Sequence, residues 1–472
     1  MTLSVLKDRH LLAALLAGLL VRVAWLLYTD TRPASDAEAY FDIAEGLASG
    51  LGYEWLGRTS AYWPVGYPAT LAALFAVFGS EVAVGEVLNL FAGLLAVTLT
   101  YLIAHDLYDR RIARTAALLV AVLPSQVFYT SVLLSEPLFT TVQLAVLWLL
   151  IRALRISEAA PGVLRQSPTV GAGAVGLGFM LPVGDVLGVS MAGALVALVV
   201  LAVVAWRLCH PAMLAWLAVG AATGYALLIR PAALTIVVAA IVVLILLLRR
   251  AEPARRRVPI ACAVVFMAAT FLVVLPWLAR NNAEFGVGAT LANNGGVNLL
   301  VGNHGGANGC WSFDPADAPL VAGPGNELDN DREAGRRALR FIREEPLEAA
   351  SLIPRKFDCM WRQDSSAVNY WNSFGQEDPP GEVALPLLRI TADWYYYGLI
   401  VLGVLGVPIW ARRTPSHILL PLVVVLTVLY YLVFFGDDRF HQPVLPIMAI
   451  WAACGVAVLP AWLRWRPPAP LP

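Results

Sequence analysis

The sequence predicts an all-α polytopic membrane protein with about twelve transmembrane helices. Of the 472 residues, 59% are hydrophobic and only 14% are charged, whereas soluble domains have roughly 45–50% apolar and about 25% charged residues. A soluble chain of this length could not bury so much apolar surface, so the bilayer must be the solvent for most of it. The same composition excludes a disordered chain and a disulfide scaffold, and a net charge of zero gives no sign of a nucleic-acid binder.

Twelve apolar stretches are close to the ~20 residues that a tilted helix needs to cross a bilayer. They are 10–28, 82–104, 113–131, 136–154, 169–188, 191–206, 211–229, 231–248, 258–278, 389–411, 416–434 and 442–463. The stretch 169–188 is the weakest of them, because it is rich in glycine and carries Asp185. A thirteenth apolar run, 66–78, is too short to span, and we expect it to enter the membrane interface and return to the same side.

Loop charge predicts the orientation. With the N-terminus in the cytoplasm, eighteen Lys and Arg residues fall in cytoplasmic segments and five in outer loops, if the long stretch 279–388 is left aside. We therefore expect both termini to lie in the cytoplasm. We expect the protein itself in the inner (cytoplasmic) membrane, as a multi-pass protein. The first helix has a basic flank without a small-residue cleavage site, which indicates a retained signal-anchor.

This topology divides the chain into three parts. An N-terminal transmembrane module, 1–278, contains a first outer loop at 29–65; an extracytoplasmic loop, 279–388, carries amphipathic helices; and transmembrane helices return at 389–472. The sequence from 326 to 361 predicts two such helices, broken at Pro346, which lie on the membrane or cap a cavity. Cys310 and Cys359 fall in this outer loop, and the sequence leaves open whether they form a disulfide or stay unpaired.

The first outer loop begins with SDAEAYFDIAEG, which indicates a short helix just after the first span. Ser35 and Glu38 have the spacing of a capping box, and an acid in the first helical turn suits the helix dipole. We assign Glu38 to that role. Asp36 lies at the mouth of an otherwise apolar bundle, where a carboxylate can also serve as a general base, so two roles remain open for it.

Six groups of residues occur in the order found in a known family of membrane enzymes. Along the chain they are Asp36-Ala37 and Tyr40 with Trp63-Pro64 and Gly66-Tyr67-Pro68; Pro124, Tyr129 and Ser135-Glu136-Pro137; Arg230-Pro231; Trp277, Arg280-Asn281 and Phe285-Gly286; the run GGVNLLVGNHGGANG; and Asp438-Arg439-Phe440-His441 with Pro443 and Pro446. Together they resemble the polytopic GT-C glycosyltransferases, specifically the relatives of protein mannosyltransferases and aminoarabinose transferases (family 39-like). Each group alone is weakly specific, but together they cover most of the chain.

The resemblance implies an enzyme that passes a sugar from a polyprenyl-phosphate carrier to an acceptor outside the cytoplasm, and it assigns the base to Asp36. Phosphate is a good leaving group, so one base and cations that neutralise the departing phosphate would suffice. Glu136, at the outer end of its span, is the second catalytic candidate, as an acceptor ligand, a second acid or a metal ligand. An interfacial carboxylate that only faces water is an equal alternative.

Basic residues at the outer ends of spans are the candidates for binding the donor phosphate. They are Arg230, Arg280, Arg439 and His441, with Lys356 added because it follows an amphipathic stretch. Arginine offers a planar fork of donors that matches phosphate oxygens. The alternative for each is a side chain that reaches the lipid headgroups. Arg439 and His441 are the best-placed pair.

Four residues are candidates for sugar or acceptor binding: Arg58, Tyr67, Asn298 and Asn303. Arg58 stands where relatives often carry a base ahead of a "PP" segment, although this chain reads Tyr62-Trp63-Pro64-Val65 there. Asparagine amides both donate and accept hydrogen bonds, as sugar hydroxyls require. A turn-rich loop is the simpler account of the Asn/Gly segment.

No cofactor is predicted with certainty, and a divalent metal stays open. The expected partners are a polyprenyl-phosphate-linked sugar, a glycan, lipid or protein acceptor, and membrane lipid, without nucleic acid. Two other functions remain. A polysaccharide ligase or polymerase of the O-antigen ligase type would need no carboxylate in the first outer loop. A twelve-span transporter is disfavoured by the lack of a sequence repeat between halves.

Overall fold

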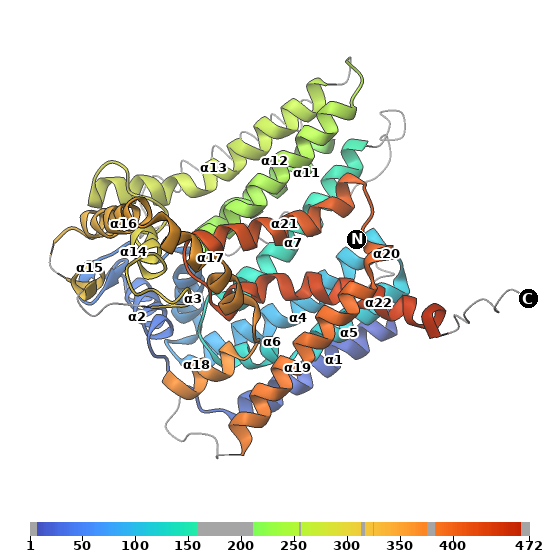
Figure 1. Ribbon diagram of the computed structural model, residues 1–472, viewed down its shortest axis with the longest axis horizontal. Helices are drawn as coiled ribbons and strands as arrows, with labels where there is room; N and C mark the ends of the chain where they lie inside the picture. The colour runs from blue at the N-terminus through green and yellow to red at the C-terminus, as the bar shows by residue number, and fades with distance from the viewer. Residues whose placement is uncertain are drawn as a thin grey trace, which may run out of the picture.

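The computed structural model of the protein describes residues 7–158, 211–253, 256–312, 317–323, 325–374 and 383–463. In these residues eight helices are long and apolar enough to cross a membrane (Figure 1). They are α1 (Arg9–Tyr28), α4 (Val82–Leu107), α7 (Glu136–Glu158), α11 (Pro211–Ile229), α12 (Leu234–Arg250), α13 (Arg257–Phe285), α21 (Pro415–Val433) and α22 (Leu445–Leu463). Each coincides with one predicted span. The predicted spans 169–188 and 191–206 lie outside the described residues, so the count of twelve stays a prediction, as does the orientation.

The predicted span 113–131 is a bent helix pair, with a 52° change of direction. It consists of α5 (Arg110–Ala121), α6 (Pro124–Phe128) and the 3-10 turn η1 (Tyr129–Ser131). Pro124 cannot continue α5, so carbonyl groups around the break lose their helical partners. Arg22 of α1, fully buried, donates to the carbonyl of Ala121 at 2.8 Å, and Asn89 of α4 donates to that of Val132 at 2.9 Å. Neighbouring helices thus satisfy the broken backbone inside the bundle.

The predicted span 389–411 corresponds to α19 (Ala384–Leu405) and α20 (Val407–Trp410). α19 packs against α22 but is not one of the eight apolar helices. Its first half carries Arg389 and Asp393, which hydrogen-bond to Asn369 at 2.7 Å and to the amide of Asp364 at 2.7 Å. The first half of α19 therefore binds residues 364–369, which precede it in the chain.

The short run 66–78 forms α3 (Gly66–Phe78), as the sequence predicts, and packs against α2 (Asp36–Ala48) and α11. Gly66 permits this packing, because a Cβ atom there would lie 2.6 Å from the backbone of Leu228. Its entry into the membrane interface stays a prediction.

Most of the segments predicted to lie outside the cytoplasm, which we call the outer segments, gather at one end of the helix bundle, to the left in Figure 1. Besides α2 and α3 they comprise α14 (Gly295–Val301), α15 (Ala318–Ala322), α16 (Glu327–Glu344), α17 (Pro346–Trp361) and α18 (Ser366–Phe374). The helix break predicted at Pro346 is confirmed. Cys310 and Cys359 form a disulfide with Cα atoms 5.4 Å apart, which resolves the alternative that the sequence left open.

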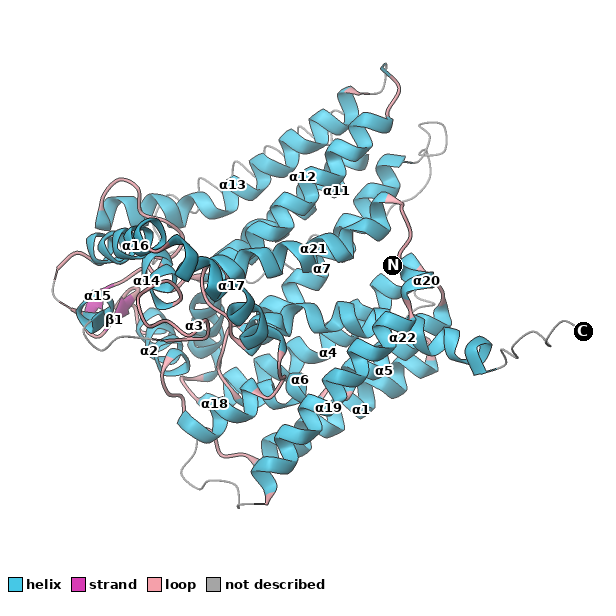
Figure 2. Cartoon of the chain, viewed as in Figure 1, coloured by secondary structure: helices cyan, strands magenta, loops and turns pink. Residues whose placement is uncertain are grey.

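Strand structure in the described residues is confined to one hairpin, drawn in magenta in Figure 2. β1 (Glu54–Trp55) pairs antiparallel with β2 (Arg58–Thr59), with Trp55 opposite Arg58. The turn residues Leu56 and Gly57 have φ of 52° and 69°, as a type I′ hairpin turn requires. The hairpin lies between α2 and α3 in the chain and contacts α2.

The predicted capping box at the start of α2 is wrong. Ser35 has φ 53° and makes no side-chain hydrogen bond to the helix. The first turn is capped from elsewhere, because the hydroxyl of Tyr370 in α18 accepts a hydrogen bond from the amide of Ala37 at 3.2 Å. Glu38 is exposed and free of the capping role that its spacing indicated.

Candidate active site

A cavity of about 1160 Å³ opens where the outer segments meet the helix ends. Its walls come from α2, the β1–β2 hairpin, the start of α7, the junction of α11 and α12, α14, α18, the end of α21 and the 3-10 helix η6 (Asp438–Val444). Five sequence-predicted site residues line it: Asp36, Glu136, Arg230, Asn298 and Arg439. Segments from the whole length of the chain therefore converge on one site.

Asp36 and Arg439 form an ion pair at this cavity. Nη1 of Arg439 donates to Oδ2 of Asp36 at 3.0 Å, and the side chains are 21% and 32% exposed. Asp36 is the first residue of α2, and Arg439 lies in η6, whose N-cap Asp437 accepts from the amide of Arg439 at 3.0 Å. The residue before Asp36 has the positive φ described above, and such backbone strain is found disproportionately at functional sites.

Glu136 and Arg230 form a second, more buried ion pair. Nη1 of Arg230 lies 2.6 Å from Oε1 of Glu136, whose side chain is 3% exposed, and also donates to Oγ of Ser135 at 3.2 Å. The ring of Phe440 lies 6.0 Å from the guanidinium of Arg230 and 5.4 Å from that of Arg439. Two guanidinium groups thus flank one aromatic ring, each beside its own carboxylate.

The rest of the lining combines aliphatic residues with acidic and aromatic ones. The acidic and aromatic ones include Glu38, Asp42, Asp437, Asp438, Trp55, Tyr62, Trp311, Tyr370, Tyr430 and Tyr431. Burial and the carboxylates of Glu38 and Glu45 raise the pKa of Asp42. Burial raises the pKa of Tyr370 to about 12. Its hydroxyl is therefore protonated at neutral pH and donates a hydrogen bond to the carbonyl of Ala34.

Sequence reasoning missed several of these residues. Asp437 and Asp438 directly precede Arg439, so their place beside a predicted phosphate ligand was a usable signal. Tyr370 gave no such signal, because its contact with the start of α2 joins residues more than 300 positions apart.

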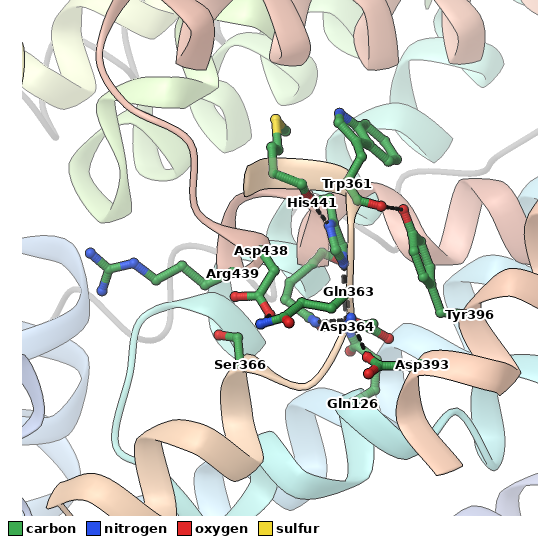
Figure 3. A network of polar contacts seen from close by, with 12 residues as sticks. Gln126, Trp361, Gln363, Asp364, Ser366, Asp393, Tyr396, Asp438, Arg439 and His441 are labelled. Atoms are coloured by element: carbon green, nitrogen blue, oxygen red, sulfur yellow. Dashed lines mark hydrogen bonds and ion pairs between the residues drawn. The ribbon is translucent and has the colours of Figure 1, made fainter. Parts of the chain in front are cut away.

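His441 lies outside the cavity lining and is fully buried. Its Nε2 is 2.9 Å from Oδ1 of Asp364, and its Nδ1 is 2.5 Å from the carbonyl of Met360 (Figure 3). The structure therefore does not bring this predicted phosphate ligand to the site.

Lys356 and Asn303 lie together, also outside the cavity lining. Nζ of Lys356 donates to Oδ1 of Asn303 at 2.8 Å, and both side chains donate to the carbonyl of Val433 at the end of α21. Burial lowers the pKa of Lys356 to about 8. The pair completes hydrogen bonds at a helix C-terminus, where carbonyls lack helical partners.

Arg280 binds the backbone of the first outer loop. Its guanidinium donates to the carbonyls of Ser60 at 2.6 Å and Tyr53 at 3.3 Å, and it lies 4.9 Å from the ring of Trp277. These contacts attach the hairpin segment to α13. Arg280 is not among the residues that line the cavity.

The last two predicted residues are also outside the cavity lining. Arg58, in β2, is exposed and donates to the carbonyl of Gly323 at 3.1 Å. Tyr67 is fully buried in α3, where its ring lies 5.0 Å from that of Tyr40.

A divalent metal, which the sequence leaves open, would need a group of oxygen or nitrogen ligands around it. Among the described residues, no group of three or more His, Cys, Asp or Glu side chains is arranged to hold a metal ion. The innermost carboxylate, Glu136, already faces the guanidinium of Arg230.

Comparison with known proteins shows which fold the chain resembles. No protein-family model and no curated protein sequence matches the chain. The oligosaccharyltransferase AglB from Archaeoglobus fulgidus, solved in complex with an inhibitory peptide and a dolichol-phosphate, overlaps with a TM-score of 0.52 at 14% identity, covering 97% of this chain and 51% of that chain. Its apo form gives 0.51 at 14% identity, with 97% and 51% covered. ArnT from Cupriavidus metallidurans bound to undecaprenyl phosphate gives 0.39 at 15% identity, with 97% and 81% covered.

At these sequence identities the similarity concerns the fold alone. The fold assignment rests on the archaeal enzyme, because the overlap with ArnT is weaker. The chain spans about half the length of that oligosaccharyltransferase. The protein is an all-α, polytopic membrane protein with a GT-C-like fold, as the sequence resemblance predicts.

Proposed function

We propose that this protein is a membrane glycosyltransferase that transfers a sugar from a polyprenyl-phosphate carrier to an acceptor at the extracytoplasmic face. One observation carries the proposal: two carboxylate–arginine pairs, Asp36 with Arg439 and Glu136 with Arg230, line a single cavity in a GT-C-like fold. The similar AglB structure contains a dolichol-phosphate, which supports a lipid phosphate as the donor's leaving group.

The two arginines suit a phosphate that arrives at the cavity. The donor's phosphodiester carries one negative charge, and a guanidinium can meet its oxygens with two parallel hydrogen bonds. The charge on the phosphate grows as polyprenyl phosphate departs, which strengthens its attraction to both arginines. When Arg439 turns to the donor, the carboxylate of Asp36 loses its partner and becomes free to accept a proton. Donor binding would thereby activate the base.

The transfer step balances without an added acid. The acceptor hydroxyl oxygen attacks the anomeric carbon, and its proton passes to the carboxylate of Asp36. The bond between that carbon and the phosphate oxygen breaks, and its electron pair leaves with the polyprenyl phosphate. Arg439 and Arg230 stabilise the negative charge that develops on the phosphate. A single displacement inverts the configuration of the anomeric carbon.

Glu136 has a supporting role in this scheme. It is buried and paired with Arg230, so it fixes the direction of that guanidinium and is not itself placed to face water. Asn298 also lines the cavity, and its amide can both donate to and accept from sugar hydroxyls.

The identity of the released lipid tests the proposal against a polysaccharide ligase. Purified protein in lipid nanodiscs is incubated with a panel of lipid-linked sugars and acceptors, with the Asp36→Asn protein as the blank. We expect polyprenyl phosphate and a glycoside of inverted configuration. Release of polyprenyl diphosphate from a lipid-pyrophosphate glycan would identify a ligase instead, and product formation by the blank would remove Asp36 as the base.

A further inference from the structure

Behind the cavity, His441 and Asp364 form an ion pair in which both side chains are 0% exposed (Figure 3). Both ring nitrogens of His441 face acceptors, as described above. The ring also stacks with Tyr396 at a centroid distance of 5.0 Å and with Trp361 at 5.5 Å. A side chain held in this way has no access to a ligand. Because His441 is held on all sides, we infer that it fixes the position of η6.

Asp364 holds η6 in place through contacts with two side chains of that helix, His441 and Gln442. Besides His441, Gln442 donates to Oδ1 of Asp364 at 2.6 Å, and Gln126 of α6 donates to Oε1 of Gln442 at 3.0 Å. Gln442 follows Arg439 by three residues, which is one turn of a 3-10 helix. Fixing His441 and Gln442 therefore fixes the rotation of η6. Figure 3 shows Arg439 extending away from this buried cluster.

The same aspartate begins the segment that reaches Asp36. Asp364 stands two residues before α18, which is anchored by a 2.9 Å hydrogen bond between Ser366 and Tyr129. From α18, the hydroxyl of Tyr370 contacts the backbone on both sides of Asp36, at Ala34 and Ala37. One buried residue thus connects to Arg439 through η6 and to Asp36 through α18.

We propose that the Asp364–His441 ion pair is a positioning element that sets the placement of Arg439 relative to Asp36. Burying two charges costs several kcal/mol in solvation, and a hydrophobic pair would often be at least as stable. Such pairs are best explained where they specify one arrangement over others. Where turnover is concerned, this inference rests on the proposed function, but the placement itself does not.

Hydrogen–deuterium exchange of the full-length protein in nanodiscs tests the placement without any substrate. Asp364→Asn keeps the shape of the side chain and removes its charge. We expect faster amide exchange in two separate segments, 437–444 and 34–40. Asp106→Asn is the matched control: Asp106 is also buried and ion-paired, with Arg152 at 2.8 Å, near the C-terminal ends of α4 and α7, far from the cavity. It should leave both segments unchanged.

Faster exchange that stays within 360–366 would overturn the proposal, as would an increase spread over the whole protein. If the single variant fails to fold, the Asp364→Asn, His441→Gln double variant replaces it, because neither partner then stays behind as an unpaired buried charge. The same two segments are expected to exchange faster in that protein.

A double-mutant cycle tests whether the pair acts through Arg439. We expect Asp364→Asn to lower kcat by at least about 10-fold in the wild-type background and by less than about 2-fold in Arg439→Gln, because coupled residues are not additive. Asp106→Asn should change kcat by the same factor in both backgrounds. An equal loss from Asp364→Asn in both would refute a positioning role. Wild-type protein without any transferase activity would contradict the proposed function, and the exchange result would still decide the placement.

Discussion

Arg439 and Asp36 are joined by a 3.0 Å hydrogen bond between residues 403 positions apart in the chain. Both residues line the cavity. Under the proposed function, the guanidinium would meet the donor phosphate and the carboxylate would meet the acceptor hydroxyl. The two side chains satisfy each other until the donor phosphate competes for the arginine. Under the proposed function, the two residues therefore depend on each other, because Asp36 becomes free to accept a proton only when Arg439 turns to the donor.

Replacement of Arg439 by glutamine should weaken donor binding more than it affects the acceptor. We expect KM for the lipid-linked sugar to rise at least about 10-fold, with KM for the acceptor nearly unchanged, because the charged fork that meets the phosphate is lost. Steady-state kinetics with each substrate varied separately measures this. Arg336→Gln, at an exposed ion pair on α16, should leave both constants unchanged, and an equal rise in both KM values would contradict the assignment.

The ion pair between Glu136 and Arg230 should affect the stability of the folded protein. Arg230→Gln leaves the carboxylate of Glu136 buried without its counter-charge, and removing one partner of a buried pair costs about 3–5 kcal/mol. The melting temperature of the single variant should fall markedly. Adding Glu136→Gln should restore most of it, because the uncompensated charge is then gone. A double variant that melts no higher than the single one would show that the pair is not the cause.

Much of the architecture could be predicted from the sequence, because hydropathy is local. The eight apolar helices, the short α3 and the break between α16 and α17 all follow from residues within one element. The predicted span 389–411 corresponds to α19 and α20, but hydropathy did not indicate that Asp393 and Arg389 hydrogen-bond to Asp364 and Asn369. Those partners lie 20 or more residues away, and hydropathy carries no information about them.

The candidate site was predictable as a set of chemical types but not as a geometry. Asp36, Glu136, Arg230 and Arg439 were selected one at a time, and only the fold shows that they pair. His441 has the sequence context of a phosphate ligand but is enclosed by tertiary contacts. Burial of this kind depends on α17, α19 and η6 together, so no single segment reveals it.

Because of Lys356, the free energy of unfolding should depend on pH in the alkaline range. Burial lowers its pKa to about 8 in the folded protein, whereas an exposed lysine titrates near 10.4. Between these values the unfolded chain binds more protons than the folded one, so the free energy of unfolding rises with pH from about 8 to about 10.4 and is nearly constant below 8. From pH 7 to pH 9.5 it should rise by about 2 kcal/mol more in wild type than in Lys356→Met, which thermal melts at the two pH values measure. Parallel curves would rule out a buried titrating lysine.

The disulfide between Cys310 and Cys359 should stabilise the outer part of the site. It closes a loop of 49 residues, which corresponds to about 4 kcal/mol in the chain-entropy model. It also holds a tight junction: Gly436 donates to the carbonyl of Gly309 at 2.9 Å, directly before Asp437. The Cys310→Ser, Cys359→Ser protein should melt lower than wild type. A reductant should lower the melting temperature of wild type and leave that of the double variant unchanged; equal sensitivity of both would contradict this prediction.

The central claim is that Asp36 is the base of a lipid-phosphate-dependent sugar transfer. The most direct measurement is the turnover number of Asp36→Asn beside wild type, with Glu45→Gln on the same helix as the control and thermal melts of all three. Glu45 is exposed and does not line the cavity. We predict a loss of at least about 100-fold for Asp36→Asn, in line with removal of a general base, with full activity for Glu45→Gln and unchanged melting for both. Wild-type turnover in a stably folded Asp36→Asn protein would contradict the account.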